Sequence, residues 1–151
     1  MNKITPFLWF DGNAAEAIAF YQSVFPASKV LSTMPGPDGT IMGATFELEG
    51  QRFMALNGGP HYKFTPAISM FVNCKTQAEV DDLWGKLGDG GRKDRCGWLQ
   101  DRFGLSWQII PSVLPTLLGN ADREGAERAM QAMLGMGKID IAALERAFAG
   151  A

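Results

Sequence analysis

The chain has 151 residues, 46% of them hydrophobic, and a formal net charge of −2 at pH 7, which is typical of one domain or of two small modules that share a core. Its Lys and Arg residues are scattered rather than gathered into a stripe, so we expect no nucleic-acid partner. No apolar run approaches the roughly 18 to 20 residues that a membrane span needs, and the start of the chain does not resemble a signal peptide. We therefore expect a cytoplasmic protein without a membrane partner, in which Cys74 and Cys96 are free thiols.

The first part of the chain predicts the order strand, helix, strand, strand, strand. Residues 3–10 ("KITPFLWF") are rich in aromatic and β-branched residues and predict a strand, with Pro6 at an edge or a bulge. A helix follows, in which Asn13 and Glu16 have the spacing of a capping box and Pro26 marks the end. Three more strands are predicted between turn signals, over residues 28–34, 40–50 and 51–57.

The same order then begins again, which indicates an internal repeat. Residues 67–73 predict a strand, and Thr76 and Glu79 form a second capping box at the start of a helix. Residues 88–95 predict a polar, glycine-rich loop. Two strands, in "CGWLQ" and "LSWQIIP", are predicted to join at residues 101–104, so the second module has one strand weak or missing.

The last part of the chain changes to helix-forming residues. A short helix or turn is predicted in "SVLPTLLGN", and longer helices over 122–138 and 140–151, the last with Asp140 as its N-cap. Their apolar faces need to pack on the barrel or on a second subunit. The predicted fold class is α+β: two βαβββ modules, residues 1–64 and 65–112, followed by a C-terminal helical extension, residues 113–151.

Three segments carry a resemblance to a known superfamily: "TPFLWFDGNAAEAIAFYQSVFP", "FMALNGG" and "CGWLQDRFGLSWQIIP". Placed in two tandem βαβββ modules, they resemble the vicinal oxygen chelate (glyoxalase/bleomycin resistance/dioxygenase) superfamily. Within it the chain is similar to the PhnB-like branch, labelled 3-demethylubiquinone-9 3-methyltransferase, over roughly residues 1–150. The resemblance implies curved sheets that enclose a cleft, and a homodimer, in some members with exchange of modules between chains.

The resemblance also implies where metal ligands would lie, at about Thr5, Ala55, Ala67 and Gln108. None of these is ionisable, whereas a divalent ion needs several carboxylate, imidazole or thiolate donors. The single histidine, His61, lies in a turn-rich connection. We therefore predict no metal site and no cofactor, and a metal-dependent glyoxalase- or dioxygenase-type enzyme is disfavoured. The methyltransferase label has no support either, because "GDGG" follows a helix and precedes strands, which is the wrong context for a cofactor loop.

Six residues are predicted to bind a small molecule in the cleft: Trp9, Asn57, Ser69, Trp98, Trp107 and Gln108. Strand alternation, taken with the ligand positions as the register, places Trp9 with Ala55 and Asn57 on the face toward the cleft. On the same grounds Ser69 and Phe71 face the cleft from their strand, and Ser106 shares the face of Gln108.

Each of these residues also has a structural alternative. The tryptophans can be core residues that fill the space of a lost metal and substrate, and Asn57 can be a turn residue. The amide of Gln108 needs a partner when buried, which is either a ligand or, slightly favoured, the opposite backbone.

Three functions are compatible with these residues. The first is a metal-free, small-molecule-binding homodimer. The second is a metal-independent enzyme of the isomerase, lyase or transferase type, with Cys96 or Asp101 as acid or base, although its catalytic residues are unknown. The third is a structural or interaction role in which the helical tail makes the contacts.

Overall fold

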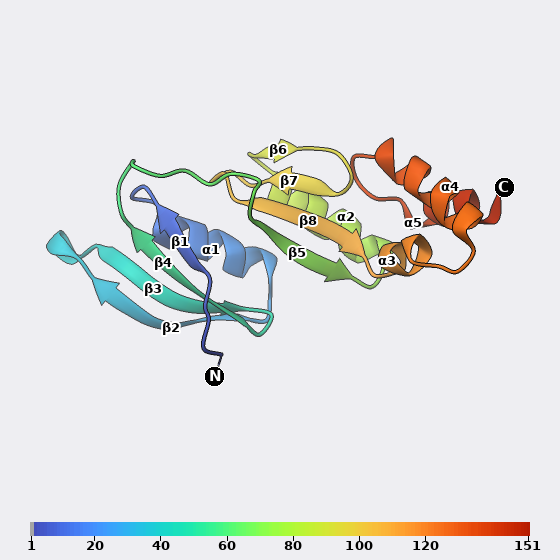
Figure 1. Cartoon of the computed structure of the whole chain (residues 1–151). Coiled ribbons are helices and arrows are strands. Elements are labelled where there is room, and N and C mark those ends of the chain that lie inside the picture. The colour runs from blue at the N-terminus through green and yellow to red at the C-terminus, as the bar shows by residue number, and fades with distance from the viewer. Residues whose placement is uncertain (1) are drawn as a thin grey trace. The chain divides into compact units, whose positions relative to one another are not determined.

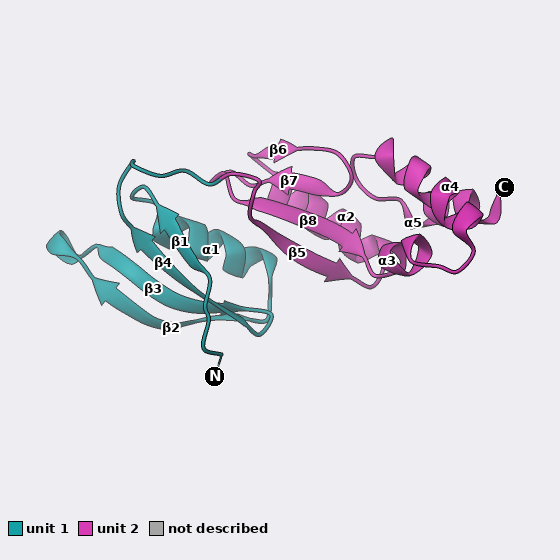
Figure 2. Cartoon of the chain, in the orientation of Figure 1, with its two compact units in different colours: residues 1–64 teal, residues 65–151 magenta. Residues whose placement is uncertain are grey.

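The computed structural model describes residues 2–151, and the chain divides into two compact units. The first unit ends at Phe64 and the second is Thr65–Ala151 (Figure 2). The fold class is α+β with two four-stranded sheets.

The first unit is a βαβββ module with the sheet order β1-β4-β3-β2. Strand β1 pairs in parallel with β4, while β2, β3 and β4 are antiparallel neighbours. The strand predicted over residues 3–10 begins only at Phe7, after Pro6, and β1 is an edge strand as Pro6 requires. The elements are β1 (Phe7–Phe10), α1 (Ala14–Val24), β2 (Ser28–Pro35), the 3-10 turn η1 (Pro37–Gly39), β3 (Ile41–Leu48) and β4 (Gln51–Asn57).

One face of the first sheet is covered by α1, which lies behind the strands in Figure 1. Apolar side chains at every second strand position meet the apolar stripe of the helix, as the amphipathic patterns predict. Phe46 and Phe53 stack there with ring centroids 5.5 Å apart. The buried residues of this covered face are Leu8, Phe10, Ala44, Phe46, Leu48, Phe53 and Ala55 from the strands, and Ala14, Ala17, Ile18, Tyr21 and Val24 from α1.

The predicted capping box of α1 is wrong, because the side chain of Asn13 makes no capping hydrogen bond. Instead Asn57, at the end of β4, reaches the start of the helix. Its Oδ1 accepts a hydrogen bond from the backbone N–H of Ala14 over 2.9 Å, and its Nδ2 donates to the carbonyl of Ile41 over 2.9 Å. A residue distant in sequence therefore satisfies one of the orphan donors at the helix start.

The second unit contains the sheet β5-β8-β7-β6, with β5 and β8 parallel and the other pairs antiparallel. The segment 88–95, predicted as a loop, contains the two-residue strand β6, so the sheet has a short fourth strand. The elements are β5 (Ser69–Cys74), α2 (Gln77–Gly88), β6 (Arg92–Lys93), β7 (Trp98–Gln100), β8 (Ser106–Pro111), α3 (Val113–Leu118), α4 (Arg123–Leu134) and α5 (Ile141–Ala149).

Helix α2 covers one face of the second sheet (Figure 1). Its predicted N-cap is confirmed, because the Thr76 hydroxyl accepts from the N–H of Glu79 over 3.2 Å. The second bond differs from that of a capping box, since the Glu79 carboxylate accepts from the N–H of Lys75 and not from that of Thr76. The buried residues of this covered face are Val80, Leu83, Trp84 and Leu87 from α2, and Cys74, Leu99, Trp107 and Ile109 from the strands.

Helices α3, α4 and α5 lie beyond one end of the second sheet and belong to the second unit (Figures 1 and 2). The side-chain amide of Gln77 on α2 binds the segment before α5, since it donates to the carbonyl of Ile139 over 2.9 Å and accepts from the N–H of Ile141 over 2.8 Å. The predicted N-cap Asp140 is confirmed by its bond from the N–H of Ala143. Their shared core consists of Ile110, Leu114, Leu117, Ala129, Ile139 and Leu144. Within residues 2–151, no helix is long and apolar enough to cross a bilayer.

Candidate functional site

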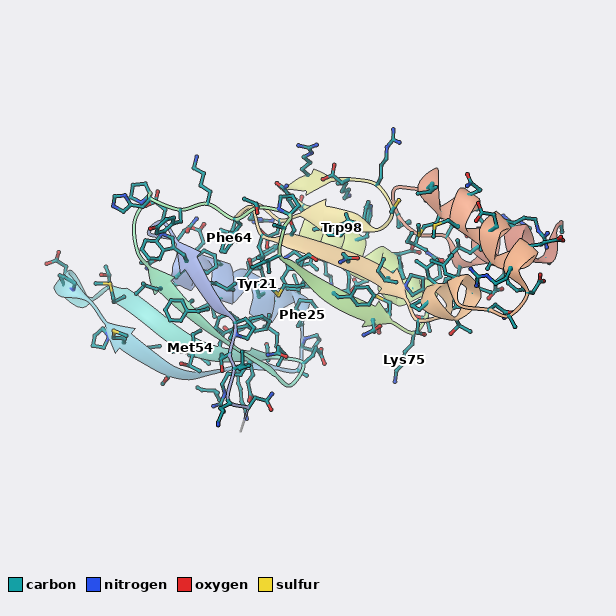
Figure 3. The ribbon with its side chains drawn as sticks, in the orientation of Figure 1. Tyr21, Phe25, Met54, Phe64, Lys75 and Trp98 are labelled. Atoms are coloured by element: carbon teal, nitrogen blue, oxygen red, sulfur yellow. The ribbon has the colours of Figure 1, made fainter. Side chains whose placement is uncertain are left out.

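On the face of the second sheet that α2 does not cover, an amide side chain lies between two aromatic side chains. The strand register places Gln108 on β8 directly beside Phe71 on β5 and Trp98 on β7. Paired residues on neighbouring strands point to the same face, with Cβ atoms about 5 Å apart. Phe71 is 49% exposed and Gln108 and Trp98 are half-buried. Figure 3 labels Trp98 on this part of the unit. We call this surface the open face of the second sheet.

A second row of the open face is polar. Ser106 on β8 is paired with Ser69 on β5 and with Gln100 on β7. The predicted sharing of a face by Ser106 and Gln108 is confirmed by this register. The hydroxyl of Ser106 is buried and has no hydrogen-bond partner within the described part of the chain, which is unusual because buried polar groups are nearly always paired.

The two rows are joined by one side-chain hydrogen bond. Gln108 donates from Nε2 to the Ser69 Oγ over 2.9 Å. The partner expected for this amide was a ligand or the opposite backbone, and the structure shows a side-chain hydroxyl in its place. A primary amide has two N–H donors and one carbonyl acceptor, so Gln108 keeps capacity for further bonds.

The open face is electrically neutral along its centre. Strands β5, β7 and β8 contain no Asp, Glu, Lys, Arg or His. At the β6 edge, Arg92 pairs with Asp94, with 3.3 Å between Nε and Oδ1. The two charges offset one another, so the groups of the open face that a ligand could contact are uncharged polar side chains and aromatic rings.

Trp107, which is among the six predicted site residues and has a core role as its structural alternative, does not share this face. Consecutive strand residues point to opposite faces, and Trp107 is paired with Leu99 on the face that α2 covers. It is 3% exposed, and its indole Nε1–H donates to Asp101 over 2.9 Å. Trp107 is therefore a core residue.

Asp101 organises the turn between β7 and β8. Its Oδ1 accepts from the backbone N–H of Phe103 over 2.8 Å and of Leu105 over 3.1 Å, and its Oδ2 accepts from Trp107. A buried carboxylate with three donors is held in place by the fold. This arrangement gives no support to Asp101 as an acid or base.

Trp9 lies on the uncovered face of the first sheet, with its N–H already used. The indole Nε1–H donates to the carbonyl of Gly59 over 2.9 Å, and the ring meets Tyr62 edge-on at 5.0 Å between centroids. A Cβ placed on Gly58 would collide with the ring. The turn after β4 therefore packs directly on Trp9 and leaves only part of its ring surface available.

Asn57 and Ala55 do not share a face with Trp9, so the predicted inward register of β4 is wrong. The register pairs Ala55 with Leu8, whereas Trp9 is paired with Leu56. Asn57 has its oxygen and its amino group bonded to backbone groups of its own unit. Its role in this structure is to hold α1 and β3 to the end of β4.

The metal positions implied by the resemblance do not fit a divalent ion. Ala55 is buried on the covered face, Ala67 has a methyl side chain, and the remaining donors are the hydroxyl of Thr5 and the amide of Gln108. Within residues 2–151, no three His, Cys, Asp or Glu side chains gather in a metal-binding group. Hard divalent ions need several oxygen or nitrogen donors at about 2.0 to 2.3 Å, which these residues do not supply.

The two cysteines are free thiols. Burial, together with the smaller effects of the charge of Glu79 and its hydrogen bond, raises the pKa of Cys74 to about 12. Cys96 lies 3.6 Å from the carbonyl of Met133, to which its thiol donates. His61 is exposed in the connection after β4. These contacts do not form a nucleophile and base pair among the described residues.

Sequence reasoning placed Ser69 and Gln108 on the face where the structure brings them together, and it left the face of Trp98 open. It did not include Gln100, which completes the polar row. The signal was present, because Gln100 is two residues from Trp98 on the same predicted strand and alternation puts both on one face.

Comparisons with known proteins agree with this architecture. A family model described as 3-demethylubiquinone-9 3-methyltransferase matches residues 2–110. A solved PhnB protein from Bacillus cereus is 36% identical, with a TM-score of 0.69, over 74% of this chain and 100% of its own. Protein PA1353 from Pseudomonas aeruginosa is 24% identical, with a TM-score of 0.60, over 71% of this chain and 95% of its own. No curated protein matches the chain.

The fold extends to a more distant group. The fosfomycin resistance protein FosX from Listeria monocytogenes, solved as a mutant with Mn(II) and a dihydroxypropylphosphonic acid, is 14% identical, with a TM-score of 0.55, over 71% of this chain and 90% of its own. The family match ends at residue 110, so the helical segment from α3 onward lies outside it, and the resemblance is shorter than the predicted 1–150. The chain belongs to the PhnB-like family, labelled 3-demethylubiquinone-9 3-methyltransferase.

Proposed function

We propose that this protein binds a small organic molecule on the open face of the second sheet, without a metal ion. The observation that carries the proposal is the indole N–H of Trp98. The N–H groups of Trp9 and Trp107 have acceptors within the protein, whereas the described residues include no acceptor for that of Trp98. A half-buried aromatic residue with a free donor, beside the Gln108 amide, is typical of a ligand contact.

The surrounding residues support the same proposal. Phe71 and Trp98 flank the amide with apolar surface, and Ser69 orients it by accepting one of its N–H groups. Small-molecule sites are mostly apolar with a few placed polar groups. The neutral donors on this face can hold a ligand through hydrogen bonds and ring contacts alone.

We further propose that the protein acts as a homodimer. The uncovered face of the first sheet exposes large apolar side chains: Phe7 is 54% exposed, Met34 is 56% exposed and Met54 is 37% exposed. The register places Phe7 beside Met54, so part of this surface is contiguous. Contiguous exposed apolar surface is a feature of protein interfaces. Light scattering after size exclusion should give twice the 16.4 kDa of the chain, and Met54→Glu should shift the mass toward the monomer.

A thermal-shift screen of small metabolites tests the binding proposal. A ligand that binds only the folded state raises the midpoint of unfolding. We expect Trp98→Ala and Gln108→Ala to remove the shift caused by an active compound. Gln131→Ala is the matched control, because Gln131 is an exposed glutamine on α4. A shift that survives both open-face substitutions would place the ligand elsewhere and overturn the assignment.

A further inference from the structure

The open face has a definite hydrogen-bonding pattern, which constrains the chemistry of its ligand. Gln108 uses one Nε2–H on Ser69. Its second Nε2–H and its Oε1 have no partner among residues 2–151. A glutamine amide can form two parallel bonds with a flat group that presents a donor next to an acceptor, as it does with the edge of adenine.

The two neighbours of Gln108 favour a planar ligand. Phe71 and Trp98 lie on the strands to either side of it, in the same row. Aromatic rings interact with flat partners in offset-stacked or edge-to-face arrangements and contribute beyond their buried area. A ring system held by the amide would lie within reach of both side chains.

Charge favours a neutral ligand. An anion is usually bound by Arg, Lys or a helix N-terminus, and a cation by a carboxylate in addition to any aromatic rings. Neither kind of residue occurs in β5, β7 or β8, and the Arg92–Asp94 pair at the edge is balanced.

The hydroxyl of Ser106 is the independent observation that points to a ligand. It is buried without a partner on the same face, between Ser69 and Gln100. Leaving such a group unsatisfied destabilises the folded protein, and a polar group of a ligand placed over the row can satisfy it. The neighbouring serine and glutamine make this the polar end of the surface.

We infer that the ligand is an uncharged, planar heterocycle with a hydrogen-bond donor and acceptor side by side, such as a lactam or an amino-substituted azine. Gln108 binds the donor–acceptor edge, Phe71 and Trp98 contact the ring, and Ser106 contacts a further polar group. This inference rests on the proposed binding function and names the chemical class that the open face selects.

Three matched compounds test it with the full-length protein. The first is 2-quinolinone, which has the donor and the acceptor. The second is 1-methyl-2-quinolinone, which has the acceptor alone, and the third is the anion 2-naphthoate. Dissociation constants come from chemical-shift titrations of the backbone and side-chain amides. We expect 2-quinolinone to bind about tenfold or more tightly than either analogue, the ratio that one or more hydrogen bonds typically provide.

Variants identify the residue responsible for the preference. Gln108→Leu should abolish the preference for 2-quinolinone, whereas the control Gln131→Leu should retain it. Gln108→Glu keeps the shape and hydrogen-bonding reach but presents acceptors only. The Gln108→Glu variant should lose affinity for 2-quinolinone. It should gain affinity for protonated 2-aminobenzimidazole, which presents two donors side by side. A reversed preference cannot come from unfolding.

The outcomes separate this inference from the proposed function. Equal affinity for the three compounds, with shifts at Trp98, would overturn the inference and leave small-molecule binding intact. The same conclusion would follow if none of them bound and a charged metabolite from the thermal-shift screen moved the Trp98 signal. If no compound in either set perturbs Trp98 or Gln108, both proposals are wrong.

Discussion

The side-chain amide of Gln108 donates to the hydroxyl of Ser69 over 2.9 Å and so joins β8 to β5 on the face that α2 leaves uncovered. A hydrogen bond of this kind, between half-buried side chains, contributes about 0.5 to 1.5 kcal/mol to the free energy of unfolding. A double-mutant cycle of Ser69→Ala and Gln108→Ala should give a coupling energy in that range, measured by urea unfolding. Gln108→Ala paired with Ser112→Ala, an exposed serine outside this face, should give none. A coupling near zero for Ser69 and Gln108 would contradict the contact.

Asp101 is expected to be among the most sensitive positions of the second unit. Asp101→Asn replaces an oxygen that accepts with an amino group that cannot, so at least one of the three N–H donors loses its partner. We expect the free energy of unfolding to fall by about 2 kcal/mol or more, and the near-ultraviolet dichroism of Trp107 to change. Asp82→Asn is the control, because Asp82 is an exposed residue paired with Lys86 on α2. Equal stability of the two variants would contradict this account.

Substitution of Asn57 should destabilise the protein more than substitution of Asn13. The capping box predicted from the sequence implies the opposite order. Asn57→Ala removes a helix-capping acceptor and a half-buried donor, which should lower the free energy of unfolding by about 1 to 2 kcal/mol. Asn13→Ala removes a side chain that makes no capping bond and should cost a few tenths. Thermal unfolding of both variants checks the order. A larger loss of stability from Asn13→Ala than from Asn57→Ala would contradict the observed cap and support the predicted capping box.

The packing of Gly58 against Trp9 can be tested by substitution with alanine, with Gly85 as the control. A methyl group at Gly58 would collide with the Trp9 ring, so Gly58→Ala should shift the indole N–H resonance of Trp9 and destabilise the first unit. At Gly85, inside α2, a methyl group meets nothing within 4 Å. Gly85→Ala should therefore raise the stability by about 0.5 to 1 kcal/mol, because alanine favours the helix.

The raised pKa of Cys74 predicts that the free energy of unfolding falls at alkaline pH. Its pKa in the folded protein is about 12, against an ordinary pKa of 9.0 for a free thiol. Above pH 9 the thiol of the unfolded chain ionises first, so the stabilisation present below pH 9 is lost progressively as the pH approaches 12. Urea unfolding between pH 7 and 10.5 should show a steeper decline for the wild type than for Cys74→Ala. Parallel pH profiles would mean that the thiol is not desolvated.

Local signals were read correctly from the sequence. Thr76 and Asp140 cap the helices that follow them, because capping depends on residues three positions apart. Strand alternation also placed Phe71 and Ser69 on one face, and Ser106 with Gln108.

Non-local contacts were not predictable in the same way. The donor at the start of α1 is satisfied by Asn57, which is distant in sequence, and the tail is fixed by the contact of Gln77 with residues Ile139 and Ile141. The faces of Trp98 and Trp107 were left open by the sequence, and the register places Trp98 beside Gln108 and Trp107 on the face that α2 covers.

The four tryptophans provide the most direct test of the central claim, that the open face of the second sheet binds the ligand. Their indole N–H groups give separate signals in a nitrogen–proton correlation spectrum, and Trp98 is the one on this face. Addition of a compound that raises the unfolding temperature should shift the signal of Trp98 and the side-chain amide of Gln108, and leave those of the core residues Trp84 and Trp107 in place. Shifts confined to Trp9, or to residues of the helical tail, with Trp98 unmoved, would contradict the claim.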